Sequence, residues 1–318
     1  MIKILVITPV KHIKGLVKIL EKSGMIKILE DPEESQVLSI IHEYDALFTN
    51  PNKSKIFIGS KLVKLAKNLK VVCTASTGTN HINKSILSKN KIKLISLTEE
   101  REIINKISST AELAFGLTLS CLRNIVPGHQ SVMDGQWDYT KFIGRQMNFL
   151  TIGIIGFGRL GEKYANYCKA FGAKILIYDP YKKIINKSYI QVNSIKTLIK
   201  ESNIISLHVH VSKETIGFIS KNEFNLMKRD VIIINTSRGD IINEIDLVDF
   251  LQKNPKSKIG TDVLTDEINS RSKSPLLLFS KSSSQVTITP HIGGMTKEAQ
   301  EIAFCHAATK LSNYLKDI

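Results

Sequence analysis

Short apolar runs alternate along the chain with segments whose apolar residues recur every three or four positions. Runs of the first kind predict strands and segments of the second kind predict helices. In the first hundred or so residues we predict strands over 3–7, 27–29, 46–49, 71–74 and 93–95, and helices over 13–23, 35–41, 60–69 and 83–89. Such regular alternation is typical of a parallel sheet with helices on both faces.

The same alternation resumes after a long apolar helix predicted over residues 110–123, which a capping box from Ser109 to Glu112 should open. An irregular arm with the single tryptophan, Trp137, follows at 127–147. We then predict strands that end near residues 155, 178, 209, 235, 263 and 289, with helices over 162–171, 194–200, 222–227 and 244–252. Six strands with intervening helices predict an α/β fold with a doubly wound parallel sheet.

A last amphipathic helix, predicted over residues 296–315, should return to the first domain. We therefore expect a discontinuous substrate-binding domain of residues 1–104 plus 294–318 and a nucleotide-binding domain of residues 105–293.

The apolar strand that ends near residue 155 leads into Gly156-x-Gly158-x-x-Gly161, a helix, a second strand and Asp179. The first glycine permits a tight turn, the second lets the backbone approach a pyrophosphate, and the third lets the helix pack on the strand. The helix N-terminus offers free N–H groups to the phosphates. A carboxylate about twenty residues further on is placed to bind the ribose hydroxyls, so Asp179 favours NAD over NADP.

Composition narrows the class of protein. Apolar content of 42% and charged content of 23% are ordinary for a globular chain. Lysines are spread along the sequence, so the net charge of +15 indicates compositional bias rather than a nucleic-acid partner, with attraction of an anionic substrate as a secondary benefit.

The apolar runs and the cysteines exclude other classes. No apolar run approaches the roughly twenty residues that a membrane helix needs, so we expect no membrane partner. The four cysteines are far apart in the sequence, and His208-x-His210 lacks a third ligand nearby. We therefore expect a cytoplasmic protein without a metal site.

Three polar residues follow predicted strands, where ligands of open α/β sheets bind: Arg238, Glu267 and His291. A nicotinamide enzyme acting on a hydroxy acid needs a cation for the carboxylate, a proton donor for the carbonyl oxygen and an acid to orient that donor. These residue types match those roles. Residues of these types at strand ends are usually solvated, and spacing alone does not bring the three together.

Four segments in this order, GFGRLG at 156–161, ISLHV at 205–209, INTSRG at 234–239 and ITPHIGG at 288–294, resemble the D-isomer-specific 2-hydroxyacid dehydrogenases. The resemblance implies two Rossmann-like domains, the smaller one flavodoxin-like, and NAD as cofactor. It also implies that Arg238 binds the substrate carboxylate, that His291 is the acid/base and that Glu267 is its partner.

The resemblance further implies a set of binding residues. Asp262 would orient the nicotinamide amide, and the backbone of Ser76, Thr77 and Gly78 would grip the substrate carboxylate. The implied cofactor-binding residues are Gly156, Gly158, Arg159, Leu160, Gly161, Asp179, His208, Thr236, Ser237, Asp262 and Gly293.

Within the family, residues 76–83 and 225–228 are most similar to the D-3-phosphoglycerate dehydrogenases, in a short form without a C-terminal regulatory domain. This similarity implies 3-phosphoglycerate as substrate, with glycerate, hydroxypyruvate or glyoxylate as alternatives. Lys53 and Lys55 are candidates to bind the phosphate, and Lys141 is a third. Ile268 stands where relatives have proline, and Lys106 where many have asparagine.

Two expectations concern partners. The partner of the site is a small 2-hydroxy or 2-keto acid, and a homodimer is expected through the nucleotide domain and the arm at residues 125–147. A reading from another class is an NAD(H)-sensing binding protein that resembles the corepressors related to this family, for which the positive charge would suit a nucleic-acid-associated complex.

Overall fold

The computed structural model describes residues 1–51, 56–267 and 270–318. They form two compact units, Met1–Ile107 with Gly294–Ile318, and Ser108–Gly293. The chain therefore crosses between the units after Ile107 and again after Gly293. From the sequence we predicted crossings after residues 104 and 293. Each unit is described by itself.

Unit 1 contains a five-stranded sheet in the order β2-β1-β3-β4-β5. All neighbouring strands are parallel. The strands are β1 (Lys3–Val6), β2 (Met25–Ile28), β3 (Ala46–Thr49), β4 (Val71–Thr74) and β5 (Lys93–Ile95). This order is that of flavodoxin-like sheets, so the predicted fold of the smaller domain is confirmed.

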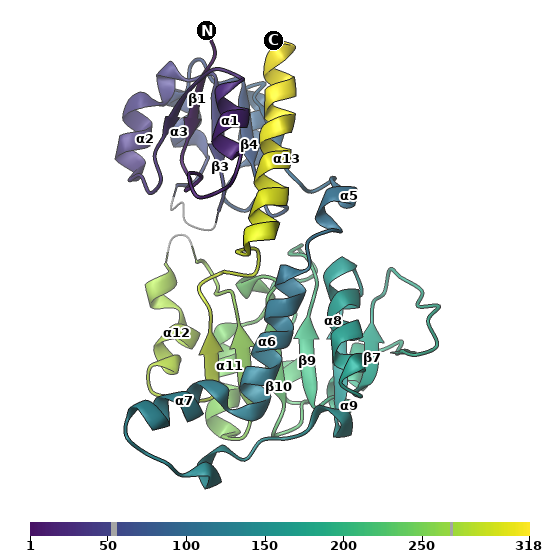
Figure 1. Ribbon diagram of the computed structural model, residues 1–318. Coiled ribbons are helices and arrows are strands. Elements are labelled where there is room, and N and C mark those ends of the chain that lie inside the picture. Colours follow the sequence, from purple (N-terminus) through teal and green to yellow (C-terminus); the bar gives the residue numbers. More distant parts are fainter. Residues whose placement is uncertain (52–55, 268–269) are drawn as a thin grey trace. The chain divides into compact units, whose positions relative to one another are not determined.

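Helices cover both faces of this sheet, as the alternating pattern predicted. They are α1 (Leu16–Glu21), α2 (Glu34–Ile40), α3 (Ser60–Leu65), α4 (Lys84–Lys89), α5 (Arg101–Ile104) and α13 (Lys297–Lys316). Buried residues of α1 and α13 pack on one face, and those of α2, α3 and α4 on the other. Figure 1 shows α13, in yellow, running beside α1. The C-terminal helix therefore completes the core of the N-terminal unit.

Unit 2 contains a seven-stranded parallel sheet in the order β12-β11-β10-β9-β6-β7-β8. The strands are β6 (Thr151–Ile155), β7 (Lys174–Tyr178), β8 (Ile190–Gln191), β9 (Ile204–Leu207), β10 (Ile232–Asn235), β11 (Lys258–Thr261) and β12 (Val286–Ile288). Counted within the unit, this is the order 3-2-1-4-5-6 of dinucleotide-binding folds with a seventh strand added. The doubly wound sheet is confirmed, but the predicted six strands omitted β8, which has only two residues.

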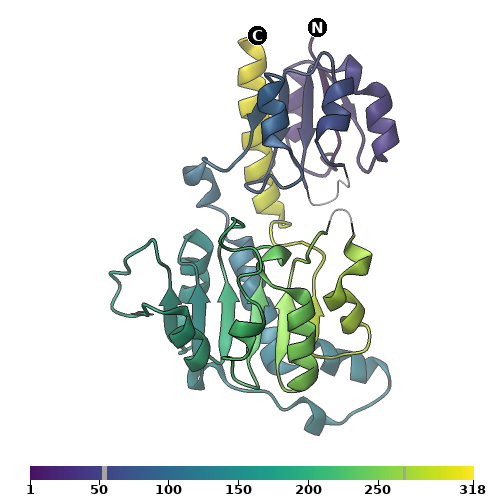
Figure 2. The same ribbon diagram turned by 180° about the vertical axis from the view of Figure 1, so that it is seen from behind.

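The helices of unit 2 also form two layers. They are α6 (Ser109–Arg123), α7 (Ile125–Met133), α8 (Arg159–Ala170), α9 (Ile195–Glu201), α10 (Lys221–Phe224), α11 (Glu244–Lys253) and α12 (Pro275–Ser280). Apolar residues of α6 and α8 pack on one face, seen in Figure 1, and those of α9 to α12 on the opposite face, seen in Figure 2. In the described part of the chain, no helix combines the length and the apolar character that crossing a membrane requires.

Two local predictions were wrong. Helix α6 has Ser108 as its N-cap, and the Ser108 hydroxyl bonds the Glu112 carboxylate at 2.5 Å, so Ser109 forms no capping box. The arm begins with helix α7, although Pro127 is its third residue. Proline is tolerated in the first turn of a helix because the N–H groups there have no partner within the helix.

Candidate active site

The glycine turn after β6 has the geometry that only glycine permits. Gly156 has φ +89°, and an added Cβ would lie 2.6 Å from the His208 carbonyl oxygen. A Cβ on Gly161 would lie 2.2 Å from the Gly156 carbonyl oxygen, so this glycine lets α8 approach the strand. A Cβ on Gly158, the N-cap of α8, would meet nothing within 4 Å. The turn therefore leaves open space at a helix N-terminus, where a pyrophosphate fits.

Asp179 lies directly after β7 and faces this turn. Its carboxylate accepts hydrogen bonds from the backbone N–H of Phe157 at 2.8 Å and of Tyr181 at 2.9 Å. The Lys182 ammonium donates to the Phe157 carbonyl at 3.1 Å and lies over the Phe157 ring. The acid is therefore held beside the glycine turn, where a ribose would lie.

Three of the other predicted cofactor residues lie at the ends of β9 and β10, and β9 is the neighbour of β6 in the sheet. The Nε2 atom of His208 is 2.8 Å from the Ser206 hydroxyl, and burial lowers the pKa of His208 to about 3. Its imidazole is therefore neutral. Thr236 is buried, and the Ser237 hydroxyl donates to the Leu207 carbonyl at 2.6 Å. Burial also lowers the pKa of Arg159 in the first turn of α8.

The structure brings two of the predicted catalytic residues into contact. The Nδ1 atom of His291 is 2.7 Å from one carboxylate oxygen of Glu267, and the other oxygen accepts the Leu264 N–H at 2.8 Å. Burial raises the pKa of Glu267, but the bond and charge of His291, the Leu264 N–H and the charge of Arg238 outweigh it, so the net pKa is lowered. Glu267 is therefore ionised beside the imidazole.

Arg238 follows β10 and acts electrostatically on Glu267. Burial lowers the pKa of its guanidinium, while the charges of Glu267 and Asp240 oppose that shift. Burial raises the pKa of Asp240, and the carboxylates of Glu267 and Asp266 raise it further. One cation, one imidazole and one ionised carboxylate thus share the carboxyl edge of the unit 2 sheet.

The predicted carboxylate-binding turn belongs to unit 1, directly after β4. The Ser76 hydroxyl lies 2.8 Å from that of Thr74 and donates to the Gly78 carbonyl at 2.7 Å, while Thr98 donates to the Thr77 carbonyl at 3.0 Å. These bonds engage the oxygen atoms of the turn rather than its amide N–H groups.

The lysines named from the sequence fall in different places. Lys53 and Lys55 lie outside the described residues. Lys106 is exposed in unit 1, and Lys141 lies in the arm of unit 2, where its ammonium is 3.4 Å from the Gln136 side-chain oxygen. In the described ranges, with their two gaps, no group of three His, Cys, Asp or Glu side chains could hold a metal ion.

One residue near the site was not predicted from the sequence. Glu244, the first residue of α11, is buried and accepts hydrogen bonds from the Thr265 N–H at 2.8 Å and the Ser274 hydroxyl at 2.6 Å. From the sequence it resembled an ordinary acid in the first turn of a helix.

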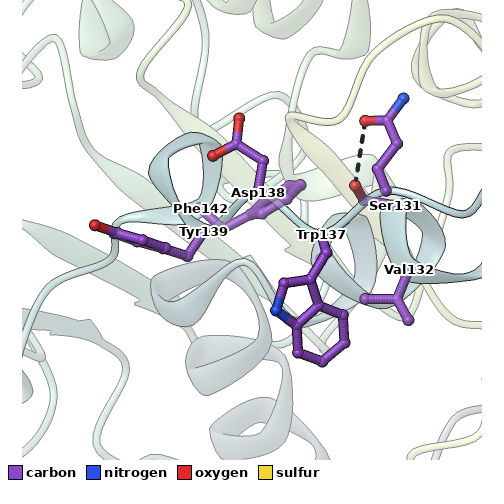
Figure 3. A pocket seen from close by; sticks show the side chains of 8 residues that line it. Ser131, Val132, Trp137, Asp138, Tyr139 and Phe142 are labelled. Carbon is purple, nitrogen blue, oxygen red and sulfur yellow. Dashed lines mark hydrogen bonds between the residues drawn. The ribbon is translucent and has the colours of Figure 1, made fainter.

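The arm of unit 2 exposes a cluster of apolar side chains. Trp137 is 90% and Tyr139 is 83% exposed. A shallow groove of about 200 Å³ lies along the arm and is lined by Ser131, Val132, Trp137, Asp138, Tyr139 and Phe142 among others. Figure 3 shows the Trp137 ring standing out from the backbone, between Val132 and Tyr139. Exposed apolar patches of this kind mark interaction surfaces.

The fold and the glycine turn define a dinucleotide-binding protein, and comparison with known proteins gives the family. Residues 115–293 match the model of the D-isomer specific 2-hydroxyacid dehydrogenase NAD-binding domain. The chain belongs to this family. The predicted family and the predicted cofactor, NAD, are thereby confirmed.

Individual proteins show the same relationship. The chain is 34% identical to a hydroxypyruvate reductase of Thermotoga maritima over 85% of each protein. It is 31% identical to a D-3-phosphoglycerate dehydrogenase of Methanocaldococcus jannaschii, over 99% of this chain and 58% of that one. The chain thus spans little more than half the length of that relative. A D-lactate dehydrogenase structure from Aquifex aeolicus, complexed with NAD and lactic acid, has a TM-score of 0.83 at 27% identity, over 99% of this chain and 96% of that chain.

Proposed function

We propose that this protein is an NAD-dependent dehydrogenase that interconverts a D-2-hydroxy acid and its 2-keto acid. The observation that carries the proposal is the 2.7 Å contact between His291 and an ionised Glu267, near the charge of Arg238 and on the same sheet as the glycine turn. A protein that only sensed a dinucleotide would need the turn but not this acid–base arrangement.

In the oxidative direction His291 accepts the proton of the substrate hydroxyl as the hydride leaves C2. NAD, when bound, accepts that hydride. Glu267 stabilises the imidazolium that forms, and Arg238 holds the carboxylate and polarises the oxygen on C2. The amide groups of residues 76–78 provide further donors for the carboxylate. In the reductive direction His291 returns the proton to the carbonyl oxygen.

The proposed substrate is 3-phosphoglycerate, with glycerate, hydroxypyruvate or glyoxylate as the alternative. Relatives named D-3-phosphoglycerate dehydrogenase and hydroxypyruvate reductase match the chain at 31% and 34% identity, so identity alone does not separate them. The positive net charge favours an anionic substrate in either case.

The substrate proposal is tested by comparing phosphorylated and unphosphorylated acids in the wild type and in the Lys53→Ala/Lys55→Ala variant. If both lysines bind the phosphate, the variant should bind 3-phosphoglycerate about tenfold or more weakly, because each charge-assisted bond contributes roughly 1.5–3 kcal/mol. Glycerate should be nearly unaffected. Equally weakened binding of both acids would show that the lysines act only through the overall positive charge of the protein. A wild type that prefers glycerate would refute the phosphoglycerate assignment.

We also propose a homodimer formed through unit 2 and its arm, at work in the cytoplasm. Exposure of Trp137 and Tyr139 supports the dimer, because burying large apolar side chains of this kind drives association. The four cysteines are free thiols, as the reducing cytoplasm favours. Sedimentation should give a dimer for the wild type and a weaker dimer for Trp137→Ala, and a monomeric wild type would contradict the proposal.

A further inference from the structure

Asp262 follows β11 and is 2% exposed. Its two carboxylate oxygens accept hydrogen bonds from the Thr289 hydroxyl at 2.5 Å and from the Ile292 and Gly293 N–H groups at 2.8 Å each. Its own carbonyl accepts the His291 N–H at 3.0 Å. One buried aspartate therefore holds four residues of the turn that carries the proposed acid/base.

That turn needs such support. His291 has φ +55°, a left-handed backbone conformation that residues other than glycine rarely adopt. Strained backbone of this kind persists only where the surroundings fix it. The turn also ends at the second chain crossing, where the Thr110 hydroxyl donates to the Gly293 carbonyl at 3.0 Å. Asp262 thus links the position of the His291 ring to the residue at which the chain leaves unit 2.

Glu244 does the same for the segment that carries Glu267. It is 6% exposed, and one of its oxygens accepts the Thr265 N–H at 2.8 Å. The other oxygen accepts the Ser274 hydroxyl at 2.6 Å and the Leu276 N–H at 3.5 Å. These donors lie on both sides of Glu267, two residues before it and seven or more after it. A single carboxylate therefore fixes both ends of that segment.

We infer that Asp262 and Glu244 are a pair of positioning residues that keep the Nδ1 atom of His291 and the carboxylate of Glu267 within hydrogen-bond distance. The inference rests on the proposed function, in which that contact serves the acid–base step. A buried carboxylate is costly unless donors satisfy it, and bonds to a charged acceptor are the stronger kind. Each carboxylate and its donors therefore hold one another in place.

The isosteric amides give the sharpest test. Asparagine or glutamine keeps the shape, but its NH2 group is a donor and, whichever way the amide lies, must face a backbone N–H that also donates. Asp262→Asn and Glu244→Gln should therefore release the two turns. Asp246→Asn is the matched control, since Asp246 lies on the same helix as Glu244 and, among the described residues, accepts a hydrogen bond only from the Lys221 N–H, at 3.0 Å.

Steady-state reduction of hydroxypyruvate should fall by about tenfold to a hundredfold in kcat for both amide variants, because small misplacements of reacting groups are costly. The midpoint of the pH profile should move, because a displaced Glu267 no longer lies within hydrogen-bond distance of the Nδ1 atom of His291. The dissociation constant of NADH, from fluorescence titration, should stay within about threefold in Glu244→Gln, because that change touches neither the glycine turn at residues 156–161 nor an implied cofactor-binding residue. Asp246→Asn should match the wild type.

Hydrogen exchange supplies a readout that does not need turnover. Amides of Ile292 and Gly293 should exchange faster in Asp262→Asn, and that of Thr265 faster in Glu244→Gln, with no change in Asp246→Asn. Thr289→Val removes one donor to Asp262 and should give a smaller change in the same direction, so it serves if Asp262→Asn does not fold. If the wild type reduces no keto acid, the proposed function fails. The exchange result still decides whether Asp262 and Glu244 hold the two turns in place.

Two outcomes would overturn the inference. Unchanged exchange in both amide variants would show that the carboxylates hold nothing. Tenfold weaker NADH binding by Asp262→Asn with an unmoved pH midpoint would show that Asp262 acts on the nicotinamide instead, as the family resemblance implies.

Discussion

The described part of the chain contains two carboxylate–imidazole pairs, one in each unit, with nearly the same local geometry. In unit 2 the Glu267 oxygen lies 2.7 Å from His291, and in unit 1 the Glu100 oxygen lies 2.8 Å from His306. The two histidine side chains are equally exposed, at 27%. Contact distance and burial therefore do not distinguish an active site from a structural ion pair.

The surroundings distinguish them. His306 lies inside the regular helix α13, and Glu100 also bonds Lys310 one turn further along that helix. This carboxylate thus joins two helices of unit 1. Helix α5 precedes the first chain crossing in the sequence, and α13 follows the second. His291 instead has a left-handed backbone at the carboxyl edge of a sheet that carries a glycine turn. Strain and position at the sheet edge are what mark the pair that we propose to be functional.

The largest difference is expected from removing each imidazole. His291→Ala should lower kcat by about 10²- to 10⁴-fold, the usual contribution of a positioned proton donor. NADH should still bind. His306→Ala should keep kcat within about twofold, because its ring serves only the α5–α13 contact. Comparable losses in the two variants would erase the distinction between the pairs.

Replacing the cation near the functional pair should have the next largest effect. Arg238→Lys should lower kcat/KM by about tenfold or more, since an ammonium cannot reproduce the two-point grip of a guanidinium on a carboxylate. Arg145→Lys is the control, because Arg145 forms a surface ion pair with Asp230 at 3.1 Å. A KM for the keto acid that is the same in Arg238→Lys and the wild type would remove Arg238 from the substrate site.

Cofactor choice should depend on Asp179 by a smaller factor. The carboxylate would lie against the extra phosphate of NADP, so the wild type should favour NAD. Asp179→Ser should narrow the ratio of the two catalytic efficiencies by several-fold, roughly 1 kcal/mol. Since Asp179 also accepts the Phe157 N–H, NAD itself should bind less tightly in the variant. A wild type that prefers NADP would exclude this role.

The smallest effect belongs to the structural pair and concerns stability. The bonds from Lys310 and His306 outweigh burial and lower the pKa of Glu100. A lowered pKa in the folded state stabilises the protein above the ordinary glutamate range, and this stabilisation is lost as pH falls through the folded-state pKa. Glu100→Gln should therefore unfold more easily than the wild type at neutral pH, by roughly 0.2–1 kcal/mol in urea melts. The two curves should converge in acid, and a constant gap at all pH values would contradict the assignment.

Much of this architecture follows from local sequence. Glycine spacing fixes the dinucleotide turn because the steric needs of Gly156 and Gly161 arise within one strand–helix unit. The alternating pattern also predicted both parallel sheets. Strand β8 was not predicted, because two residues are too few to show a periodic pattern. Helix α7 was not predicted to include Pro127, because proline usually ends or precedes a helix.

The supporting contacts of the site could not be predicted in the same way. Glu244 meets Ser274 across thirty positions of the sequence, and Asp262 meets Gly293 across thirty-one. Such pairs depend on how loops that are distant in the sequence fold together. The periodic patterns that predict helices and strands contain no information about these contacts. The left-handed backbone of His291 is likewise set by contacts with Asp262 rather than by the residue's own preference.

The chirality of the product tests the central claim most directly. Purified protein, NADH and a prochiral 2-keto acid such as phenylpyruvate or hydroxypyruvate should yield NAD and the D-2-hydroxy acid, with loss of most of this activity in His291→Ala. Formation of the L-enantiomer, or NADH binding without reduction of any keto acid in a broad panel, would contradict the account.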